Sequence, residues 1–222
     1  MKLALIGYGR MGHIIERIAL ERGHEVVCRI DKDNTDDFSS EAFRSADVAI
    51  EFTTPQTAES NIRRSWEAGV PVVCGTTGWQ TVLPALQKEL QTNGKALFWS
   101  SNFSIGVNLF FALNKRLAEL MKPYPQYHAQ MTEIHHVHKL DAPSGTAVTL
   151  ASDIGFPAAE IKSIREGEVP GTHIVEYDSA VDRIEIRHEA KSREGFAFGA
   201  VLAAEYLQGR CGFYTMHDLT GL

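Results

Sequence analysis

The first part of the chain alternates between two hydrophobic periods. LALI at 3–6 and HEVVCRID at 24–31 are typical of buried strands, and MGHIIERIALERG at 11–23 is typical of an amphipathic helix. The isoleucines of that stretch fall on one helical face, and the glycine at its end is a common helix stop. The pattern therefore predicts a β-α-β unit at the start of the chain.

The same alternation continues up to residue 105. Strands are predicted at 47–53, 70–75 and 95–100, with helices at 58–69 and 81–94, while the polar stretch 32–46 holds at most a short helix at 39–45. Strands and helices that alternate in this way form a parallel sheet with helices on both faces. We therefore predict an α/β fold whose first domain, residues 1–105, is built on a Rossmann-type parallel sheet.

After residue 105 the pattern changes to consecutive strands. Helices are predicted at 106–122 and 141–155, and strands at 127–139, 161–165, 172–179 and 182–190. This order is typical of an α+β domain on a mixed sheet, which we place at residues 106–190. A helix at 195–209 and a short strand at 211–216 fit a return to the first domain, so we assign residues 191–222 to it.

A glycine-rich loop joins the first predicted strand to the first helix. GYGRMG has the GxGxxG spacing, in which the absent side chains let the backbone approach a pyrophosphate and the helix N–H groups point at it. An acid at the end of the second strand then hydrogen-bonds the adenine ribose. We expect this loop to bind NADH or NADPH, the alternative being a glycine turn without a ligand. The residues placed at the cofactor are Gly7, Tyr8, Gly9, Arg10, Met11, Gly12 and Asp31.

Two adjacent residues bear on the choice between the two cofactors. Asp31 favours the free ribose hydroxyls of NADH, whereas Lys32 pairs with the 2′-phosphate of NADPH. The adjacency predicts use of both. The alternative is that Lys32 is a solvated loop charge.

Three further polar loops follow predicted strands. The carboxyl ends of parallel strands border the ligand crevice, so we expect these loops to flank the ribose and nicotinamide. Ordinary loop chemistry would explain any one of them alone. They contain Phe52 to Pro55, then Gly75, Thr76 and Thr77, and finally Ser100, Ser101, Asn102 and Phe103.

The densest chemistry lies in EIHHVHKLDAPSGTA, residues 133–147. In an extended segment His135 and Lys139 project to one face, and the intervening histidines to the other. The helix start at Gly145 and Thr146 offers backbone N–H groups that suit a carboxylate. These features predict an anion pocket, with Lys139 as an ammonium acid and His135 as a proton donor or electrostatic stabiliser.

Two other interpretations of this segment stay open. His136, His138 and Asp141 have a spacing that zinc could use, although the adjacent Lys139 would repel a dication and we predict no metal. His138 alone is as well explained by a structural role. A different class of function is a non-enzymatic nicotinamide sensor, in which the second domain only signals or docks partners.

Composition excludes several classes of protein. The apolar share of 44% suits a buried core, and a formal net charge of -6 without basic clusters argues against nucleic-acid binding. Cys28, Cys74 and Cys211 have no pairing pattern and are interpreted as reduced thiols of a cytoplasmic protein. The apolar run at the N-terminus is too short for a signal-peptide core, and no stretch is long enough to span a membrane.

The motifs together resemble one known family over nearly the whole chain. GYGRMG, the GTTG loop, SNFSIGVN and above all EIHHVHKLDAPSGTA are similar to 4-hydroxy-tetrahydrodipicolinate reductase, also called dihydrodipicolinate reductase. The resemblance implies NAD(P)H-dependent reduction of 4-hydroxy-tetrahydrodipicolinate to tetrahydrodipicolinate, in the diaminopimelate route to lysine. It also implies a homotetramer whose substrate-binding domains, residues 106–190, join through their sheets.

The resemblance also implies residue roles. His135 would be the proton donor or acceptor and Lys139 the proton donor, while His136, Gly145 and Thr146 would bind a substrate carboxylate. Arg193 matches an arginine expected near the active site. Lys32 stands where arginine is common, and its point charge would bind a 2′-phosphate without a planar fork.

Overall fold

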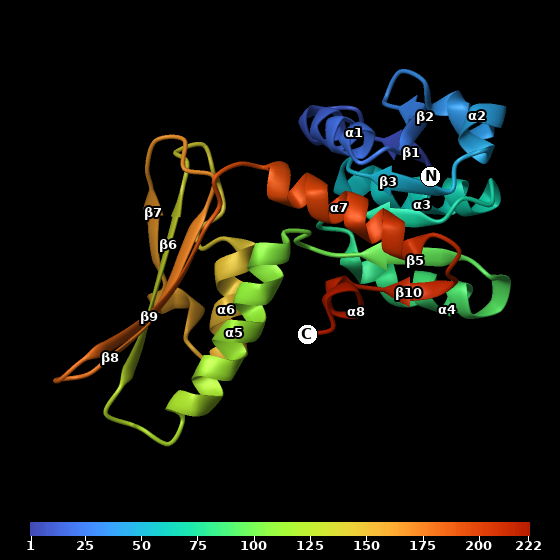
Figure 1. The fold of residues 1–222 in the computed structure, drawn as a ribbon. Coiled ribbons are helices and arrows are strands. Elements are labelled where there is room, and N and C mark those ends of the chain that lie inside the picture. Colours follow the sequence, from blue (N-terminus) through green and yellow to red (C-terminus); the bar gives the residue numbers. More distant parts are fainter. The chain divides into compact units, whose positions relative to one another are not determined.

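The computed structural model divides the chain into two compact units. It describes the backbone of residues 1–222 and the side chains of residues 1–90 and 94–222. One unit contains residues 1–105 and 194–222, and the other contains residues 106–193 (Figure 1). Within the described residues, no helix is both long and apolar enough to cross a membrane.

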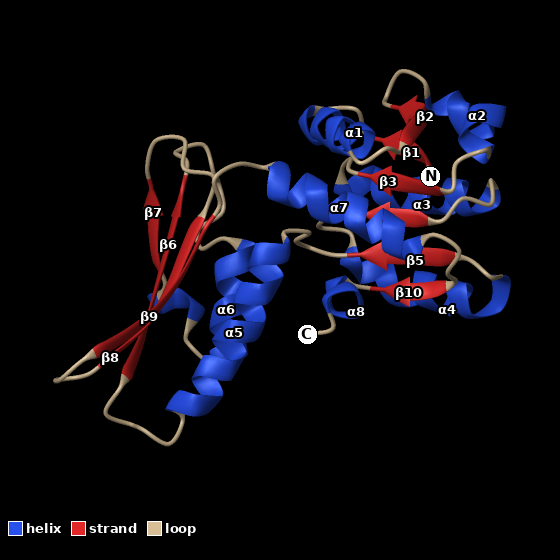
Figure 2. Ribbon diagram, viewed as in Figure 1, coloured by secondary structure: helices blue, strands red, loops and turns tan.

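The first unit is a six-stranded sheet in which all neighbouring strands are parallel, in the order β10-β5-β4-β3-β1-β2 (Figure 2). The chain order reverses between β1 and β3, where such sheets bind their ligands. The strands are β1 Lys2–Ile6, β2 Glu25–Ile30, β3 Val48–Glu51, β4 Val72–Cys74, β5 Ala96–Trp99 and β10 Gly212–Tyr214. The helices are α1 Arg10–Glu21, α2 Glu41–Arg44, α3 Pro55–Glu67, α4 Leu83–Asn93, α7 Glu194–Leu207 and α8 Met216–Thr220, with 3-10 turns η1 Thr35–Ser39 and η2 Gln80–Val82.

Burial on both faces explains the continuous apolar run at 3–6 in β1. In β1, Leu3 and Leu5 pack in the core beneath α1 and α7. Ala4 and Ile6 belong to the core on the opposite face, which α2, α3 and α4 cover. Because successive side chains of a strand point to opposite faces, a strand covered on both sides needs apolar residues at every position.

The second unit is a mixed four-stranded sheet in the order β7-β6-β8-β9, with β6 parallel to β7 and the other pairs antiparallel. Helices α5 and α6 pack on one face through Phe110, Leu150 and Val175. The elements are α5 Ile105–Met121, β6 His128–His135, α6 Gly145–Ile154, η3 Ala158–Glu160, β7 Lys162–Arg165, β8 Thr172–Asp178 and β9 Arg183–Glu189.

The structure confirms the predicted parallel and mixed sheets and all the predicted helices and strands, with shifts at their ends. The polar stretch 32–46 holds η1 as well as the short helix. Helix α8 was not predicted, although Thr215 and Asp218 form a capping box before it.

The prediction of an extended segment up to residue 139 was wrong. Strand β6 ends at His135, and a turn follows in which the Lys139 N–H donates to the His136 carbonyl over 3.1 Å. The adjacent polar residues His135 and His136 interrupt the alternation of polar and apolar positions at the point where β6 ends, and the predicted strand extended past this interruption. The argument that placed His135 and Lys139 on one strand face therefore does not hold.

Candidate active site

The glycine loop between β1 and α1 is built on contacts that leave no room for side chains. Gly7 has φ +91°, and a Cβ there would lie 2.0 Å from the Phe52 carbonyl oxygen. A Cβ on Gly12 would lie 2.5 Å from the Gly7 carbonyl oxygen. A Cβ on Gly9 would meet nothing within 4 Å. Two of the glycines are thus required by the fold, while Gly9 leaves open space at the loop surface.

The start of α1 suits an anion. Gly9 is the N-cap residue, so no side chain caps the first turn, and the first turn holds no acidic residue. The unpaired backbone N–H groups and the helix dipole together favour a negative group at such an end. Arg10 is exposed there, and Met11 is half-buried.

A cavity of about 360 Å³ adjoins this loop, at the end of the sheet where the chain order reverses. Asp31 and Lys32 contribute to its wall, as do Thr53 and Thr54 after β3. The Asp31 carboxylate accepts from the Lys32 N–H over 2.9 Å, which fixes it at the end of β2. A tight glycine turn, an open helix start and an acid on the second strand together fit a dinucleotide.

Tyr8 is held at the edge of this loop. Its hydroxyl donates to Glu16, which also pairs with Arg29 on β2. The hydrogen bond to Glu16 raises the pKa of Tyr8, so the phenol keeps its proton near neutral pH. These contacts attach the loop to both α1 and β2.

The two threonine loops are joined to each other. The Thr53 N–H donates to Thr76 Oγ1 over 2.8 Å. The Thr76 carbonyl accepts from Trp79 Nε1 (2.7 Å) and from Trp99 Nε1 (3.3 Å). Thr76 is buried and Thr77 is exposed, so Thr77 is the one whose side chain is accessible to a ligand.

A carboxylate that the sequence analysis missed supports these loops. Glu51, at the end of β3, has no exposed surface and accepts from the Thr53 hydroxyl. Cys74 Sγ donates to Glu51 Oε2 over 2.9 Å, and burial is the largest cause that raises the pKa of this thiol well above its ordinary value. An acid inside a predicted apolar strand was the signal that could have found it.

The segment after β5 forms a compact turn. Ser100 Oγ donates to the Asn102 carbonyl over 2.8 Å, and Ser101 is exposed. Phe103 is only 2% exposed, between Phe98 and Phe52. Its side chain is part of the core, so a cofactor contact at Phe103 would have to come from its backbone.

In the second unit, the turn after β6 and the start of α6 contain the residues from which an anion pocket was predicted. Lys139 Nζ lies 2.7 Å from Asp141 Oδ1. Burial opposes ionisation of Asp141, but the hydrogen bond and charge of Lys139 hold the pKa of that carboxyl below its ordinary value. Ser144 caps α6 by accepting from the Ala147 N–H over 3.2 Å, so the helix begins at Gly145 and not at residue 141, where the predicted helix began.

His135 is buried within a group of charged side chains. Its side chain is 9% exposed, and its Nδ1 pairs with Glu133, which has no exposed surface. Glu133 Oε1 also lies 2.8 Å from Arg165 Nη1 on β7. Burial is the largest cause that lowers the pKa of His135, and Glu133 opposes that shift.

His173 on β8, which the sequence analysis did not single out, borders the same group. Its ring centroid lies 5.2 Å from that of His135, and its Nε2 lies 3.2 Å from Ser144 Oγ. Burial lowers the pKa of His173 to about 3, so the ring is neutral near pH 7. Its position, alternating with Val175 and Tyr177 in an otherwise apolar strand face, was the available signal.

The structure does not bring the proposed zinc ligands together. His138 is exposed and pairs with Glu168 over 3.2 Å, while Asp141 pairs with Lys139. Among the described residues, only Glu133, His135 and His173 have metal-ligand spacing, with their atoms within 4.8 Å. Arg165 already neutralises Glu133, and a dication there would meet its charge, so we assign no metal.

His136 differs from both neighbouring histidines. It is half-buried, and its Nδ1 is buried without a hydrogen-bond partner among the described residues. A buried polar atom without a partner is costly unless a ligand or water satisfies it. Arg193 is half-buried just before α7, and no contact in the described part of the chain assigns it a role.

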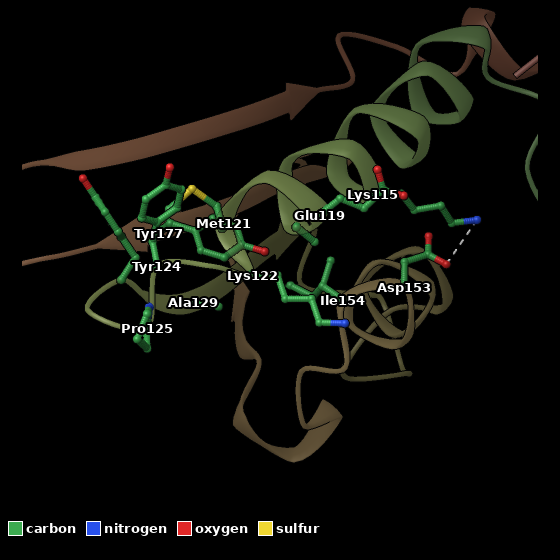
Figure 3. A pocket seen from close by; sticks show the side chains of 12 residues that line it. Lys115, Glu119, Met121, Lys122, Tyr124, Pro125, Ala129, Asp153, Ile154 and Tyr177 are labelled. Carbon is green, nitrogen blue, oxygen red and sulfur yellow. Dashed lines mark ion pairs between the residues drawn. The ribbon is translucent and has the colours of Figure 1, made fainter.

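A separate cavity of about 640 Å³ lies between the end of α5, α6 and the sheet of the second unit. Figure 3 shows Lys115 and Asp153 at one end, 3.4 Å apart, and Tyr124 and Tyr177 at the other. None of the predicted site residues lines it.

Two family models match almost the entire chain. The model described as "Dihydrodipicolinate reductase, N-terminus" matches residues 1–103, and the one described as "Dihydrodipicolinate reductase, C-terminus" matches residues 106–220.

Several curated relatives carry one name. 4-Hydroxy-tetrahydrodipicolinate reductase of Christiangramia forsetii is 44% identical, over 99% of this chain and 97% of the relative. The enzymes of that name from Thermosipho africanus and Archaeoglobus fulgidus are each 34% identical, over 99% and 98% of this chain and 97% and 99% of their own lengths.

Solved structures share the fold. Dipicolinate-bound dihydrodipicolinate reductase from Paenisporosarcina sp. TG-14 superposes with a TM-score of 0.76 at 22% identity, covering 97% of both chains. Aspartate dehydrogenase from Thermotoga maritima gives a TM-score of 0.55 at 14% identity, covering 94% of this chain and 97% of that one.

Proposed function

Because the chain belongs to the dihydrodipicolinate reductase family, we propose that it reduces 4-hydroxy-tetrahydrodipicolinate to tetrahydrodipicolinate with NADH or NADPH. This reaction is a step of the diaminopimelate route to lysine. The observation that carries the proposal is the presence, on one chain, of a tight glycine loop before an open helix start and of Lys139, His135 and the serine-capped start of α6. The sensor and metal-enzyme alternatives have no support from the relatives.

The substrate is a small dicarboxylate, and the start of α6 suits one of its carboxylates. We assign that carboxylate to the backbone at Gly145 and Thr146 and to His136, whose buried Nδ1 has no partner among the described residues. Lys139 is held by Asp141, so a substrate carboxylate would compete with Asp141 for the ammonium. Substrate binding would thus move the Lys139 ammonium away from the Asp141 carboxylate and toward the substrate carboxylate.

The proton chemistry follows from the charges around the pocket. A bound reduced pyridine nucleotide supplies the hydride. Loss of the 4-hydroxyl group as water leaves an acceptor conjugated to the carboxylates, which gains negative charge when it takes the hydride. The Lys139 ammonium stabilises this charge and neutralises it by donating a proton. His135 is the second group that exchanges a proton with the substrate. The residues Gly7 to Gly12, Asp31, Lys32, Gly75 to Thr77 and Ser100 to Phe103 would hold the cofactor.

The purified protein should oxidise both cofactors when freshly generated substrate is added. The loss of absorbance at the reduced-nicotinamide band measures the reaction directly. A protein that binds the cofactor but shows no substrate-dependent loss would fit the sensor instead. Full activity after exhaustive chelation would agree with the absence of an assigned metal.

The two cofactors should be used with less than about a thousandfold difference in kcat/KM. Asp31 and Lys32 are both exposed, and both line the cavity. The ribose hydroxyls of NADH would therefore have the Asp31 carboxylate as a partner, and the 2′-phosphate of NADPH would have the Lys32 ammonium. Lys32→Ala should weaken NADPH use selectively, and Asp31→Ala should weaken NADH use selectively. If Lys32→Ala left NADPH kinetics unchanged, Lys32 would be a solvated loop charge.

We also propose that the protein is a homotetramer joined through the second unit. The face of its sheet opposite α5 and α6 carries the half-buried Ile134 and Ile174 and the exposed Arg187. Light scattering should give a mass of about four times 24.6 kDa. A monomer at working concentrations would contradict this.

We place the protein in the cytoplasm. Cys28, Cys74 and Cys211 are free thiols, which persist in a reducing compartment. Cell fractionation that recovered the protein in an oxidising compartment would contradict this placement.

A further inference from the structure

Glu133 is a buried carboxylate to which the proposed chemistry gives no role of its own. It lies two residues before His135 on β6, so both side chains project from one face of the strand. That face also carries the buried Met131. A carboxylate without exposed surface is costly unless it is paired, so its place beside a proposed catalytic histidine calls for a function.

Glu133 is held from two sides. Its Oε2 pairs with His135 Nδ1, and its Oε1 lies 2.8 Å from Arg165 Nη1. Arg165 is fixed in turn by backbone acceptors, since it donates to the Ile164 carbonyl (2.8 Å) and to the Asp141 carbonyl (2.6 Å). The carboxylate therefore has a defined orientation toward the imidazole.

The contacts keep this carboxyl ionised. Burial acts most strongly and opposes ionisation, but hydrogen bonds from Ser163 and Arg165 and the charges of His135 and Arg165 leave the pKa of Glu133 below its ordinary value. An ionised carboxylate only accepts hydrogen bonds, so the nitrogen that faces it must carry a proton. His135 Nδ1 is that nitrogen.

The other ring nitrogen faces a glycine. A Cβ on Gly171 would lie 3.0 Å from His135 Nε2, and Gly171 has φ +153°, which side chains rarely adopt. The space in front of Nε2 is thus kept free of a side chain on that side. Nε2 is the nitrogen that the surroundings leave for exchange with a ligand.

We propose that Glu133 is a positioning residue that holds a proton on His135 Nδ1 and so reserves Nε2 for proton exchange with the substrate. The inference rests on the proposed role of His135. It names a Glu–His pair, fixed by Arg165, in which the glutamate acts only through the histidine.

Several groups act on the imidazole, and Glu133 differs from the others. Burial, Lys139 and Arg165 all lower the pKa of His135, whereas Glu133 raises it. Among the strongest influences, Glu133 alone thus favours the protonated ring. The charged and titratable groups that act on His135, or that act on one of those groups in turn, are Glu133, Lys139, Asp141, Arg165, His173 and His188.

The first test reads the tautomer without any assay. In ¹⁵N NMR of the intact wild-type enzyme near neutral pH, the imidazole signal that disappears in His135→Asn should show a protonated Nδ1 and an unprotonated Nε2. The opposite tautomer would overturn the proposal. This measurement decides the matter even if Glu133 variants fail to fold.

The second test reads the pH profile of kcat/KM. In Glu133→Gln, the limb governed by His135 should move to lower pH by about one unit, because the charge that favours the imidazolium is gone. Glu133→Asp, which restores the charge at a shorter reach, should recover part of this shift. An unshifted limb in a folded Glu133→Gln enzyme would overturn the proposal.

Two controls separate the possible failures. Glu119→Gln removes an exposed carboxylate that pairs with Arg116 over 2.9 Å on α5 of the same unit, and it should leave the limb in place. His135→Asn tests the proposed function itself. If His135→Asn keeps full activity, the role of His135 fails; if it loses activity while Glu133→Gln shifts nothing, only the present inference fails.

Discussion

Replacing Lys139 by alanine should lower turnover by about a hundredfold or more and leave NADPH affinity nearly unchanged. The Lys139 ammonium lies beside the Asp141 carboxylate in the second unit, whereas the glycine loop belongs to the first. Loss of the Lys139 ammonium removes the proposed proton source and the charge that stabilises the reduced substrate. Steady-state kinetics and a fluorescence titration with NADPH measure the two effects separately.

The chain offers a matched control for this variant. Lys115 also pairs with an aspartate, Asp153, over 3.4 Å in the same unit, but it lies in the cavity that holds none of the predicted site residues. Lys115→Ala should therefore keep turnover within about twofold of wild type. Wild-type turnover in Lys139→Ala would remove the proposed acid.

Replacing Gly7 by alanine should destabilise the protein by about 3 kcal/mol or more. The new Cβ would lie 2.0 Å from the Phe52 carbonyl oxygen, and the residue would have to keep φ +91°. Because that oxygen belongs to backbone at the end of β3, a rotamer change cannot relieve the clash. Urea unfolding of the cofactor-free protein measures the loss.

Gly9→Ala provides the contrasting result. A Cβ there meets nothing within 4 Å, so stability should stay within about 0.5 kcal/mol of wild type. The methyl group would instead occupy the space through which a pyrophosphate approaches the start of α1, and NADPH affinity should fall at least about tenfold. Equal NADPH affinity in Gly9→Ala would argue against a dinucleotide at this loop.

Local pattern was enough to predict most of the fold. In β1, the uninterrupted apolar run at 3–6 indicated a buried strand, and Leu3 and Ala4 indeed pack into opposite cores. The prediction of a strand up to residue 139 was wrong, because it extended past His135 and His136, where the alternation of polar and apolar residues is interrupted. The length and register of a strand also depend on the strands that pair with it, and the pattern within one segment does not identify those strands.

Some residues of the candidate site could be predicted from the sequence, and others could not. The glycine loop and the start of α6 could be predicted, because GxGxxG and a serine before a helix are local signals with a local physical cause. Glu133 lay inside the quoted motif but received no role, and His173 was not considered. Arg165 was seen only as part of a strand.

The amino-acid sequence by itself determined the order of elements, the parallel and mixed sheets, and the residue types available for binding anions and moving protons. Tertiary structure decided which of those side chains meet. Strand pairing brings Arg165 and His173 beside His135, although both are distant from it in the chain. Such contacts depend on register between strands, and the pKa values in this group depend on burial, so neither can be obtained from neighbouring residues alone.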